Sequence, residues 1–289
     1  MAFDPSICEA HGLDPARTAG VRVLVMTGYG LNCEDETAHA FSMLGCTVDR
    51  RHVGDLVDGA GRDTLAGWDI LAFIGGFSFG DHVASGRVYA NRLRYRLGEA
   101  LASFVDRGGL AVGMCNGFQT MVKLGILPGI DRGTGTLAPQ QTSLVANARL
   151  GYYNGWVTMR ADPESPCLWT RGVGTIDLPS RHGEGQLVYG SPDVEARLQE
   201  ARQVPLRYVD GTGAPTTEWP ANPNGSAGGA GALCDASGRL FGLMPHPEAF
   251  LYAENHPRWR ARHDGGHARR WGEGVQIFAN GVRAALDAK

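Results

Sequence analysis

One short stretch, from Leu110 to Gln119, limits what this chain can fold into more than any other. Its apolar residues have the length of a buried strand and end abruptly at Cys115, which has a glycine two residues to either side. Gly113 and Gly117 lack a Cβ atom, so the backbone can fold sharply around the cysteine. The spacing predicts a strand, a tight turn and a helix over residues 117–124, with the thiol exposed as in a nucleophile elbow.

The position of this thiol also favours reactivity. Partial positive charge at the N-terminus of the following helix would favour the thiolate, which is the nucleophilic form of cysteine. The alternative is an inert cysteine buried at the end of a core strand. The G-x-C-x-G spacing alone leaves both interpretations open.

Composition narrows the class of protein. The chain has 289 residues, enough for one large α/β domain or two small ones, and its 42 glycines suit a fold with many tight turns. A formal net charge of -3 gives no basic field for nucleic acid or an anionic membrane. The cysteines are scattered without a C-x-x-C pair, which is typical of the reducing cytoplasm. We expect a cytoplasmic protein that binds a small substrate or a protein partner, and neither nucleic acid nor membrane.

The chain is expected to consist of a short N-terminal segment and one domain. Residues 1–20 contain no continuous apolar stretch, so we expect an irregular N-terminal extension that is neither a signal peptide nor a membrane anchor. Residues 21–289 are expected to form a single domain. It opens with a strand over 21–26, a glycine-bearing loop over 27–32 and a helix over 34–44. A dinucleotide site is disfavoured there, because the third glycine is missing and three acidic residues begin the helix.

The rest of the first half alternates between strands and helices, whereas the second half consists mainly of short strand-like runs. Further elements of the first half are expected at 46–48 and 69–74 for strands and at 99–107 for a helix. After Gly133 the chain shows short strand-like runs, namely 143–148, 156–159, 186–189 and 206–209, then a helix over 192–201 capped by Ser191, a hairpin of strands over 230–234 and 240–244, and a closing helix over 274–286. We therefore expect a mostly parallel sheet with antiparallel excursions in the second half.

A second informative loop follows the strand over 69–74. It runs from Gly75 to Asp81 with the sequence GGFSFGD. Glycines at this place allow backbone N–H groups to point into the crevice at the carboxyl edge of the sheet. A tight structural turn is the alternative, and it accounts for two glycines but not for three.

The segment from Pro245 to Glu248 is the third. Its two prolines predict an extended backbone, in which alternation places His246 and Glu248 on the same side. An imidazole and a carboxylate held together can act as a base and the group that orients it.

One spacing resembles a metal site. His263 and His267 are four residues apart, as ligands on one helix face would be. Gly265 and Gly266 lie between them, so we expect a solvated loop over 256–270 and no metal.

Together these stretches resemble the class I glutamine amidotransferases, and within them the glutaminase subunits of phosphoribosylformylglycinamidine synthase. The matching motifs, in the order of that family, are Gly75–Asp81, Gly113–Gln119, His182–Gly185, Asn222–Ser226 and Met244–Glu248. The resemblance covers nearly the whole chain from Val21 onward. It departs from the family pattern at Gly151–Trp156, at Arg181 and at Ala249.

The resemblance implies a three-layer, flavodoxin-like α/β fold and a set of site residues. Cys115 would be the nucleophile, His246 the general base and acid, and Glu248 the group that orients the imidazole. The oxyanion hole and the glutamine site would involve Gly75, Gly76, Phe77, Asn116, Gln119 and His182.

The implied activity is hydrolysis of L-glutamine to glutamate and ammonia through a cysteinyl thioester. Ammonia would pass to a separate ATP-dependent synthetase, with a small adaptor subunit as a further partner. The chain has no G-x-x-x-x-G-K-[ST] motif, so we expect no cofactor here and expect ATP and Mg²⁺ on the synthetase. Three alternatives stay open: an amidotransferase subunit for another pathway, a non-catalytic regulatory subunit, and a cysteine peptidase or deglycase-like hydrolase.

Overall fold

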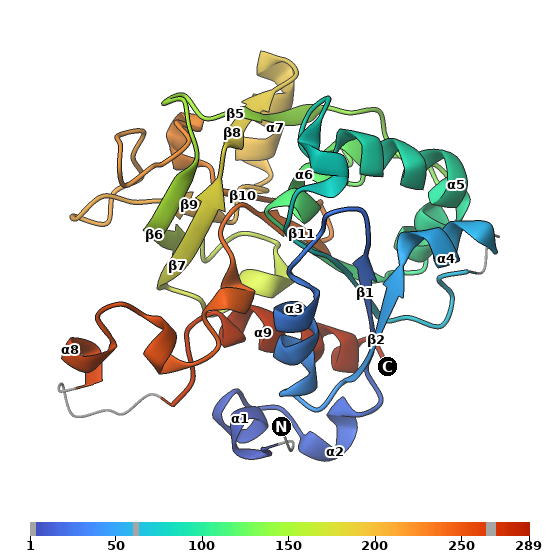
Figure 1. Cartoon of the computed structure of the whole chain (residues 1–289), viewed down its shortest axis with the longest axis horizontal. Helices are drawn as coiled ribbons and strands as arrows, with labels where there is room; N and C mark the ends of the chain where they lie inside the picture. The colour runs from blue at the N-terminus through green and yellow to red at the C-terminus, as the bar shows by residue number, and fades with distance from the viewer. Residues whose placement is uncertain (1–3, 60–63, 264–269) are drawn as a thin grey trace.

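The structure, a computed structural model, describes residues 4–59, 64–263 and 270–289 (Figure 1). A six-stranded sheet lies at its centre with strand order β10-β11-β4-β3-β1-β2. Neighbours pair in parallel except β10 and β11, which form an antiparallel pair at one edge. The strands are β1 (Arg22–Thr27), β2 (Thr47–His52), β3 (Ile70–Phe73), β4 (Leu110–Met114), β10 (Ala232–Cys234) and β11 (Leu240–Leu243). The order of the parallel strands is that of flavodoxin-like folds, so the predicted class is confirmed.

Helices cover both faces of this sheet, because successive side chains of each strand point to opposite faces. Val23 and Val25 of β1 pack in one core, and Leu24 and Met26 pack in the other. The first face is covered by α3 (Glu34–Ser42) and α9 (Val275–Asp287), and the second by α4 (Val53–Asp58), α5 (Arg87–Asp106) and α6 (Asn116–Leu124). The central strands β3 and β4 are buried along their whole length.

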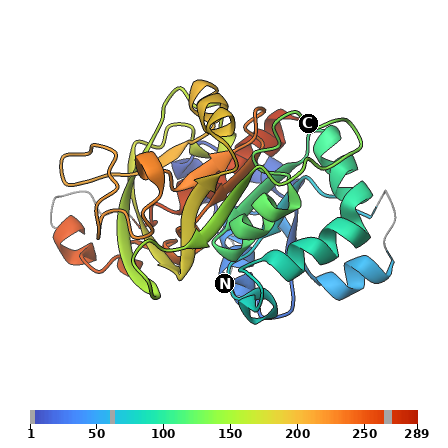
Figure 2. The same cartoon turned by 90° about the horizontal axis from the view of Figure 1, so that it is seen from above.

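The second half adds two small antiparallel sheets beside the central one (Figure 2). One pairs β5 (Thr142–Ala146) with β8 (Glu184–Tyr189), and the other has the order β7-β6-β9, from β6 (Tyr153–Ala161), β7 (Thr175–His182) and β9 (Leu206–Tyr208). The expected antiparallel excursions are confirmed, as is α7 (Pro192–Glu200), in which the Ser191 hydroxyl accepts a hydrogen bond from the Val194 N–H at 3.2 Å. Strand β7 was not expected from the sequence, although its alternating Ile176 and Leu178 are buried.

The prediction of an irregular N-terminal extension is wrong for the part of it that is described. Residues 4–20 contain two short helices, α1 (Ser6–Ala10) and α2 (Pro15–Thr18). Ile7 and Cys8 of α1 are fully buried in the core that contains α9. The Arg17 guanidinium also donates to the Leu286 carbonyl at 3.2 Å. These contacts pack the N-terminal segment against α9. The sequence did not reveal this packing, because the apolar residues of the segment are separated by polar ones.

Two further expectations need correction. Helix α5 begins at Arg87 rather than near residue 99, and the buried series Tyr89, Leu93, Leu97 and Leu101 is the signal that marks its first half. The stretch 256–270 was expected to be a loop, but α8 (Trp259–His263) is a short helix within it. His267 lies outside the described residues, so the prediction about a His263–His267 metal pair stays a prediction.

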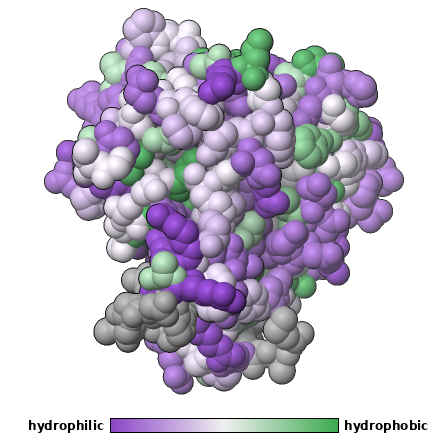
Figure 3. All heavy atoms as spheres, turned by 60° about the vertical axis from the view of Figure 1, so that its left-hand side comes forward, coloured by the Kyte–Doolittle hydropathy of each residue, from purple (hydrophilic) through white to green (hydrophobic). Residues whose placement is uncertain are grey.

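The face that carries α8 and the β6–β7 sheet is mainly hydrophilic, with apolar groups scattered over it (Figure 3). Within the described ranges, no helix combines the length and the apolar character that crossing a bilayer requires.

Candidate active site

The three informative stretches of the sequence meet at one edge of the sheet. Strands β11, β4 and β3 are parallel neighbours, and their carboxyl ends lead into His246, Cys115 and the Gly75 loop respectively. In open α/β sheets this edge is where ligands bind. The fold therefore gathers residues that are far apart in the chain.

Cys115 is held in a nucleophile elbow, as predicted. Its backbone has φ +50° and ψ -109°, which a non-glycine residue adopts only when the surrounding structure imposes it. A Cβ atom on Gly117 would lie 1.9 Å from the Phe73 carbonyl oxygen, and one on Gly113 would lie 2.5 Å from the Met121 sulfur. The two flanking glycines are thus required by close packing around the turn.

The predicted exposure of this thiol is wrong. Cys115 is only 7% exposed, and its Sγ lies 3.5 Å from the carbonyl oxygen of Arg181, to which it donates a hydrogen bond. Arg181 belongs to β7, the strand that the sequence pattern did not reveal. Because that strand comes from another sheet, spacing around the cysteine could not predict that it would be covered.

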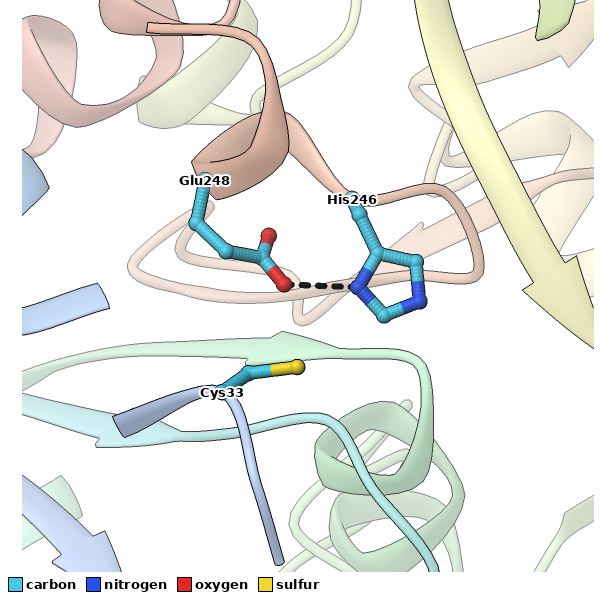
Figure 4. A group of neighbouring side chains, drawn as sticks. All are labelled: Cys33, His246 and Glu248. Atoms are coloured by element: carbon cyan, nitrogen blue, oxygen red, sulfur yellow. Dashed lines mark hydrogen bonds and ion pairs between the residues drawn. The ribbon is translucent and has the colours of Figure 1, made fainter. Parts of the chain in front are cut away.

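His246 and Glu248 form a buried pair. The Nδ1 atom of His246 lies 2.6 Å from Oε1 of Glu248, and both side chains are almost wholly buried (Figure 4). The predicted pairing is present, but the predicted reason is wrong: Pro247–Ala249 is a 3₁₀ turn, not an extended segment. The His246 N–H donates to the Pro179 carbonyl at 2.8 Å, so β7 also fixes the histidine.

The charge state of His246 follows from these neighbours. Burial alone would lower the pKa of the imidazole, because it disfavours the charged form. The Glu248 carboxylate and the sulfur of Cys115 outweigh burial and raise the pKa of His246 well above its ordinary value. The carboxylate at Nδ1 also fixes the orientation of the ring, so Nε2 is directed away from Glu248. That Nε2 is buried and has no hydrogen-bond partner in the described structure.

A second thiol, Cys33, lies beside this pair. Its sulfur, a ring nitrogen of His246 and a carboxylate oxygen of Glu248 all lie within 4.8 Å of one another (Figure 4). A Cβ atom on Gly75 would be 2.9 Å from Cε1 of His246 and 3.1 Å from the Cys33 sulfur, so only glycine fits there. Burial raises the pKa of Cys33, and the Glu248 carboxylate adds to the effect. No local pattern marks Cys33 in the sequence, since no glycine lies within two residues of it.

The predicted oxyanion residues lie beside the elbow. Gly76 has φ +137° and forms an isolated antiparallel bridge with Leu31. The N–H of Phe77 donates to the Gly30 carbonyl at 2.9 Å, so it is not available to an oxyanion. Asn116 is the first residue of α6, where an N–H has no partner inside the helix.

Side chains on α6 join the elbow to the neighbouring loops. The Asn116 amide donates to Asp81 at 3.0 Å and to the Gln119 side-chain oxygen at 3.1 Å. Gln119 in turn donates to the Glu184 carbonyl at 2.5 Å. Burial raises the pKa of the Asp81 carboxyl. The Gln119 amide is thus used within the protein, and its predicted contact with glutamine stays a prediction.

His182 lies nearby in a neutral state. Its Nδ1 is 3.0 Å from Oδ1 of Asn147, and the Asn147 amide donates to the His182 carbonyl at 2.9 Å. Burial, followed by the positive charge of His246, lowers the pKa of His182 to about 3. It is therefore not a general acid at neutral pH, and its role in glutamine binding stays a prediction. Tyr152 is 56% exposed, and its ring centroid lies 6.2 Å from that of Phe77.

Comparison with known proteins agrees with this geometry. Residues 20–283 match the model of the CobB/CobQ-like glutamine amidotransferase domain, and the chain belongs to this family of glutamine amidotransferases. Its relatives include the phosphoribosylformylglycinamidine synthase subunit PurQ of Methanococcus maripaludis, 40% identical over 90% of this chain and 96% of the relative. The protein of the same name from Dehalococcoides mccartyi is 38% identical over 92% and 98%.

The fold also resembles a solved structure. A chain of the PurLQS structure from Thermotoga maritima matches with a TM-score of 0.65 at 24% identity, over 92% of this chain and 99% of that one. At this identity the likeness concerns the arrangement of the elements.

Proposed function

We propose that this chain is the glutaminase subunit of a phosphoribosylformylglycinamidine synthase. It hydrolyses L-glutamine and delivers ammonia to a separate ATP-dependent synthetase in purine biosynthesis. The observation that carries the proposal is a strained, helix-capping Cys115 at the sheet edge next to a buried His246–Glu248 pair. The identity of 40% to a PurQ subunit over 90% of the chain favours this acceptor pathway over that of a paralogue.

The first chemical step joins the thiolate of Cys115 to the side-chain carbonyl carbon of glutamine. A C–S bond forms and the carbonyl electron pair moves to oxygen. The resulting oxyanion is held by backbone N–H groups, for which Gly76 and Asn116 are the candidates. The imidazolium of His246 then gives its proton to the nitrogen as the C–N bond breaks, and ammonia leaves.

A glutamyl thioester remains on Cys115. Neutral His246 takes a proton from water as the water oxygen attacks the thioester carbon. The C–S bond breaks, glutamate is released and the thiolate–imidazolium pair returns. Glu248 favours the imidazolium in both half-reactions, since its carboxylate lies 2.6 Å from Nδ1.

We assign no cofactor to this chain and place ATP and Mg²⁺ on the synthetase, with a small adaptor subunit as a further partner. All six cysteines are free, which supports a reducing, cytoplasmic location.

A reconstituted complex with the synthetase tests the proposal. Cys115→Ala should abolish product formation from glutamine and leave product formation from an ammonium salt nearly unchanged. Cys46→Ala, which removes a buried thiol away from the sheet edge, is the matched control. Loss of the ammonium-dependent reaction in Cys115→Ala, or glutamine-dependent synthesis without Cys115, would refute the assignment.

A further inference from the structure

We propose that the loop from Gly28 to Asn32 is a positioning element that sets the orientation of the oxyanion hole. The inference rests on the proposed function and extends it to a loop that makes and breaks no bonds. The loop follows β1, and its glycines had no assigned role once a dinucleotide site was disfavoured.

Backbone hydrogen bonds tie this loop to the glycine loop that follows β3. The N–H of Asn32 donates to the Gly75 carbonyl at 3.2 Å. In the opposite direction, the N–H of Phe77 donates to the Gly30 carbonyl at 2.9 Å. Two reciprocal bonds fix both peptide planes that flank Gly76, as in a short piece of antiparallel sheet.

The orientation of one peptide plane follows from these bonds. The carbonyl of Gly75 points toward the 28–32 loop, and the peptide between Gly75 and Gly76 is not among the cis bonds of the described chain. In a trans peptide the N–H points opposite to the carbonyl. Because β3 lies between β1 and β4, the Gly76 N–H is directed to the side where β4 ends in Cys115.

Close approach of the two loops depends on glycine in both. A Cβ atom on Gly76 would lie 2.6 Å from the Leu31 Cα. A Cβ atom on Gly30, where φ is +98°, would lie 2.5 Å from the Phe77 carbonyl oxygen. The bridge can form only while these positions carry no side chain.

Aromatic side chains clamp the loops a few residues away. The rings of Tyr29 and Phe79 stack with centroids 4.4 Å apart, and the Phe79 N–H donates to the Tyr29 carbonyl at 2.6 Å. The Arg92 guanidinium lies 5.1 Å from the centre of the Tyr29 ring. Both aromatic residues have φ +54°, a conformation that costs free energy and persists where neighbours impose it. Strain on both sides of the bridge indicates that its geometry is maintained for function.

An aldehyde analogue of glutamine without the α-amino group, 5-oxopentanoate, tests the orientation of the hole, because it has no amine with which to close into a cyclic imine. The Cys115 thiolate adds to its carbonyl carbon, a C–S bond forms, and the carbonyl electron pair becomes an oxyanion in the position of the reaction intermediate. Affinity for the aldehyde is measured by calorimetry on the full chain. Affinity for glutamine is measured in a Cys115→Ala background, where no covalent bond forms.

Gly30→Ala should weaken aldehyde binding at least about tenfold, as loss of one oxyanion donor does, and weaken glutamine binding less than about threefold. Tyr29→Ala should act in the same direction, while Tyr29→Phe, which keeps the stack, should bind like the wild type. Gly172→Ala is the matched control, because it places alanine at φ +68° with no atom within 4 Å of the new Cβ.

The outcomes separate two failures. A wild-type chain that does not bind the aldehyde would overturn the proposed glutaminase function. A wild type that binds it, together with Tyr29→Ala and Gly30→Ala variants that bind it equally well, would overturn the positioning role. Should Gly30→Ala not fold, Tyr29→Ala against Tyr29→Phe decides alone.

Discussion

Two cysteines stand beside the same histidine, and each is the residue that precedes a helix. Cys115 caps α6 and Cys33 caps α3. Cys115 has φ +50°, whereas Cys33 has an ordinary φ of -107°. The first turn of α6 contains no acidic residue, whereas that of α3 contains three. A helix N-terminus stabilises a thiolate only where its partial positive charge is not cancelled.

The comparison teaches that closeness to a base does not by itself make a nucleophile. The Cys33 sulfur lies near the Glu248 carboxylate, and burial and this charge raise the pKa of Cys33. The sulfur of Cys115 instead donates a hydrogen bond to the Arg181 carbonyl at 3.5 Å and is one of the groups that raise the pKa of His246. The environments of the two sulfurs therefore favour Cys115 over Cys33 as the proposed nucleophile.

The largest effect should come from removing the thiol of Cys115. Cys115→Ser should lower glutamine hydrolysis by about 10³-fold or more, as loss of a triad nucleophile does. An electrophilic glutamine analogue should label Cys115 alone, as mass spectrometry of digested protein can establish. An adduct on Cys33 with Cys115 unmodified would reverse the assignment.

Removing the charge of Glu248 should have the next largest effect. Glu248→Gln should lower turnover by about a hundredfold, since general acid–base catalysis contributes factors of this size. The KM for glutamine should change little, because Glu248 contacts the imidazole and not the substrate. Steady-state kinetics with the synthetase present measure both. A raised KM with unchanged turnover would mean that Glu248 binds glutamine.

The same variant should change the pH profile in a stated direction. Burial lowers the pKa of His246, and Glu248 is the first of the groups that raise it above the ordinary value. Without that charge the imidazolium loses its proton at lower pH. The alkaline limb of kcat/KM should therefore move to lower pH in Glu248→Gln. A limb that stays in place would show that His246 does not act as the acid.

The strained backbone at Cys115 depends on the glycine at position 117, so a side chain there should lower the stability of the fold. Gly117→Ala places a Cβ atom 1.9 Å from the Phe73 carbonyl oxygen and should lower the free energy of unfolding by about 1–3 kcal/mol. Gly98→Ala, a helical position with no atom within 4 Å of the new Cβ, should be neutral or stabilising. Urea unfolding compares the two, and equal stability would show that the elbow tolerates a side chain.

The smallest effect concerns the acids of α3. Asp35→Asn with Glu36→Gln restores part of the helix charge at Cys33 and should raise its alkylation rate about threefold. A Cys115→Ala background removes the competing thiol. Rates followed by mass spectrometry at several salt concentrations measure the change. No acceleration at low salt would mean that burial alone protects Cys33.

Local patterns in the sequence were sufficient where short-range sterics decide the structure. The elbow at Cys115 depends on glycines two residues away, and the α7 cap depends on Ser191 three residues before the N–H that it accepts. Apolar periodicity likewise predicted most strands and helices after residue 20, but not α4, β7 or α8. The predicted order indicated a mostly parallel sheet with its site at the carboxyl edge. The pairing of His246 with Glu248 was predicted for the wrong reason, since a 3₁₀ turn and not an extended chain brings them together.

Tertiary structure alone decided what surrounds those residues. Cys33 lies close to His246 although β4 and β3 separate β1 from β11 in the sheet, a closeness that no spacing along the chain records. The Pro179 and Arg181 carbonyls reach His246 and Cys115 because β7 folds over the sheet edge. The sequence by itself selected Cys115 as the proposed nucleophile, since the glycines that permit its strained turn are local. Only packing between distant strands determined its burial and the contacts of its base, since these arise from elements that meet after the chain has folded.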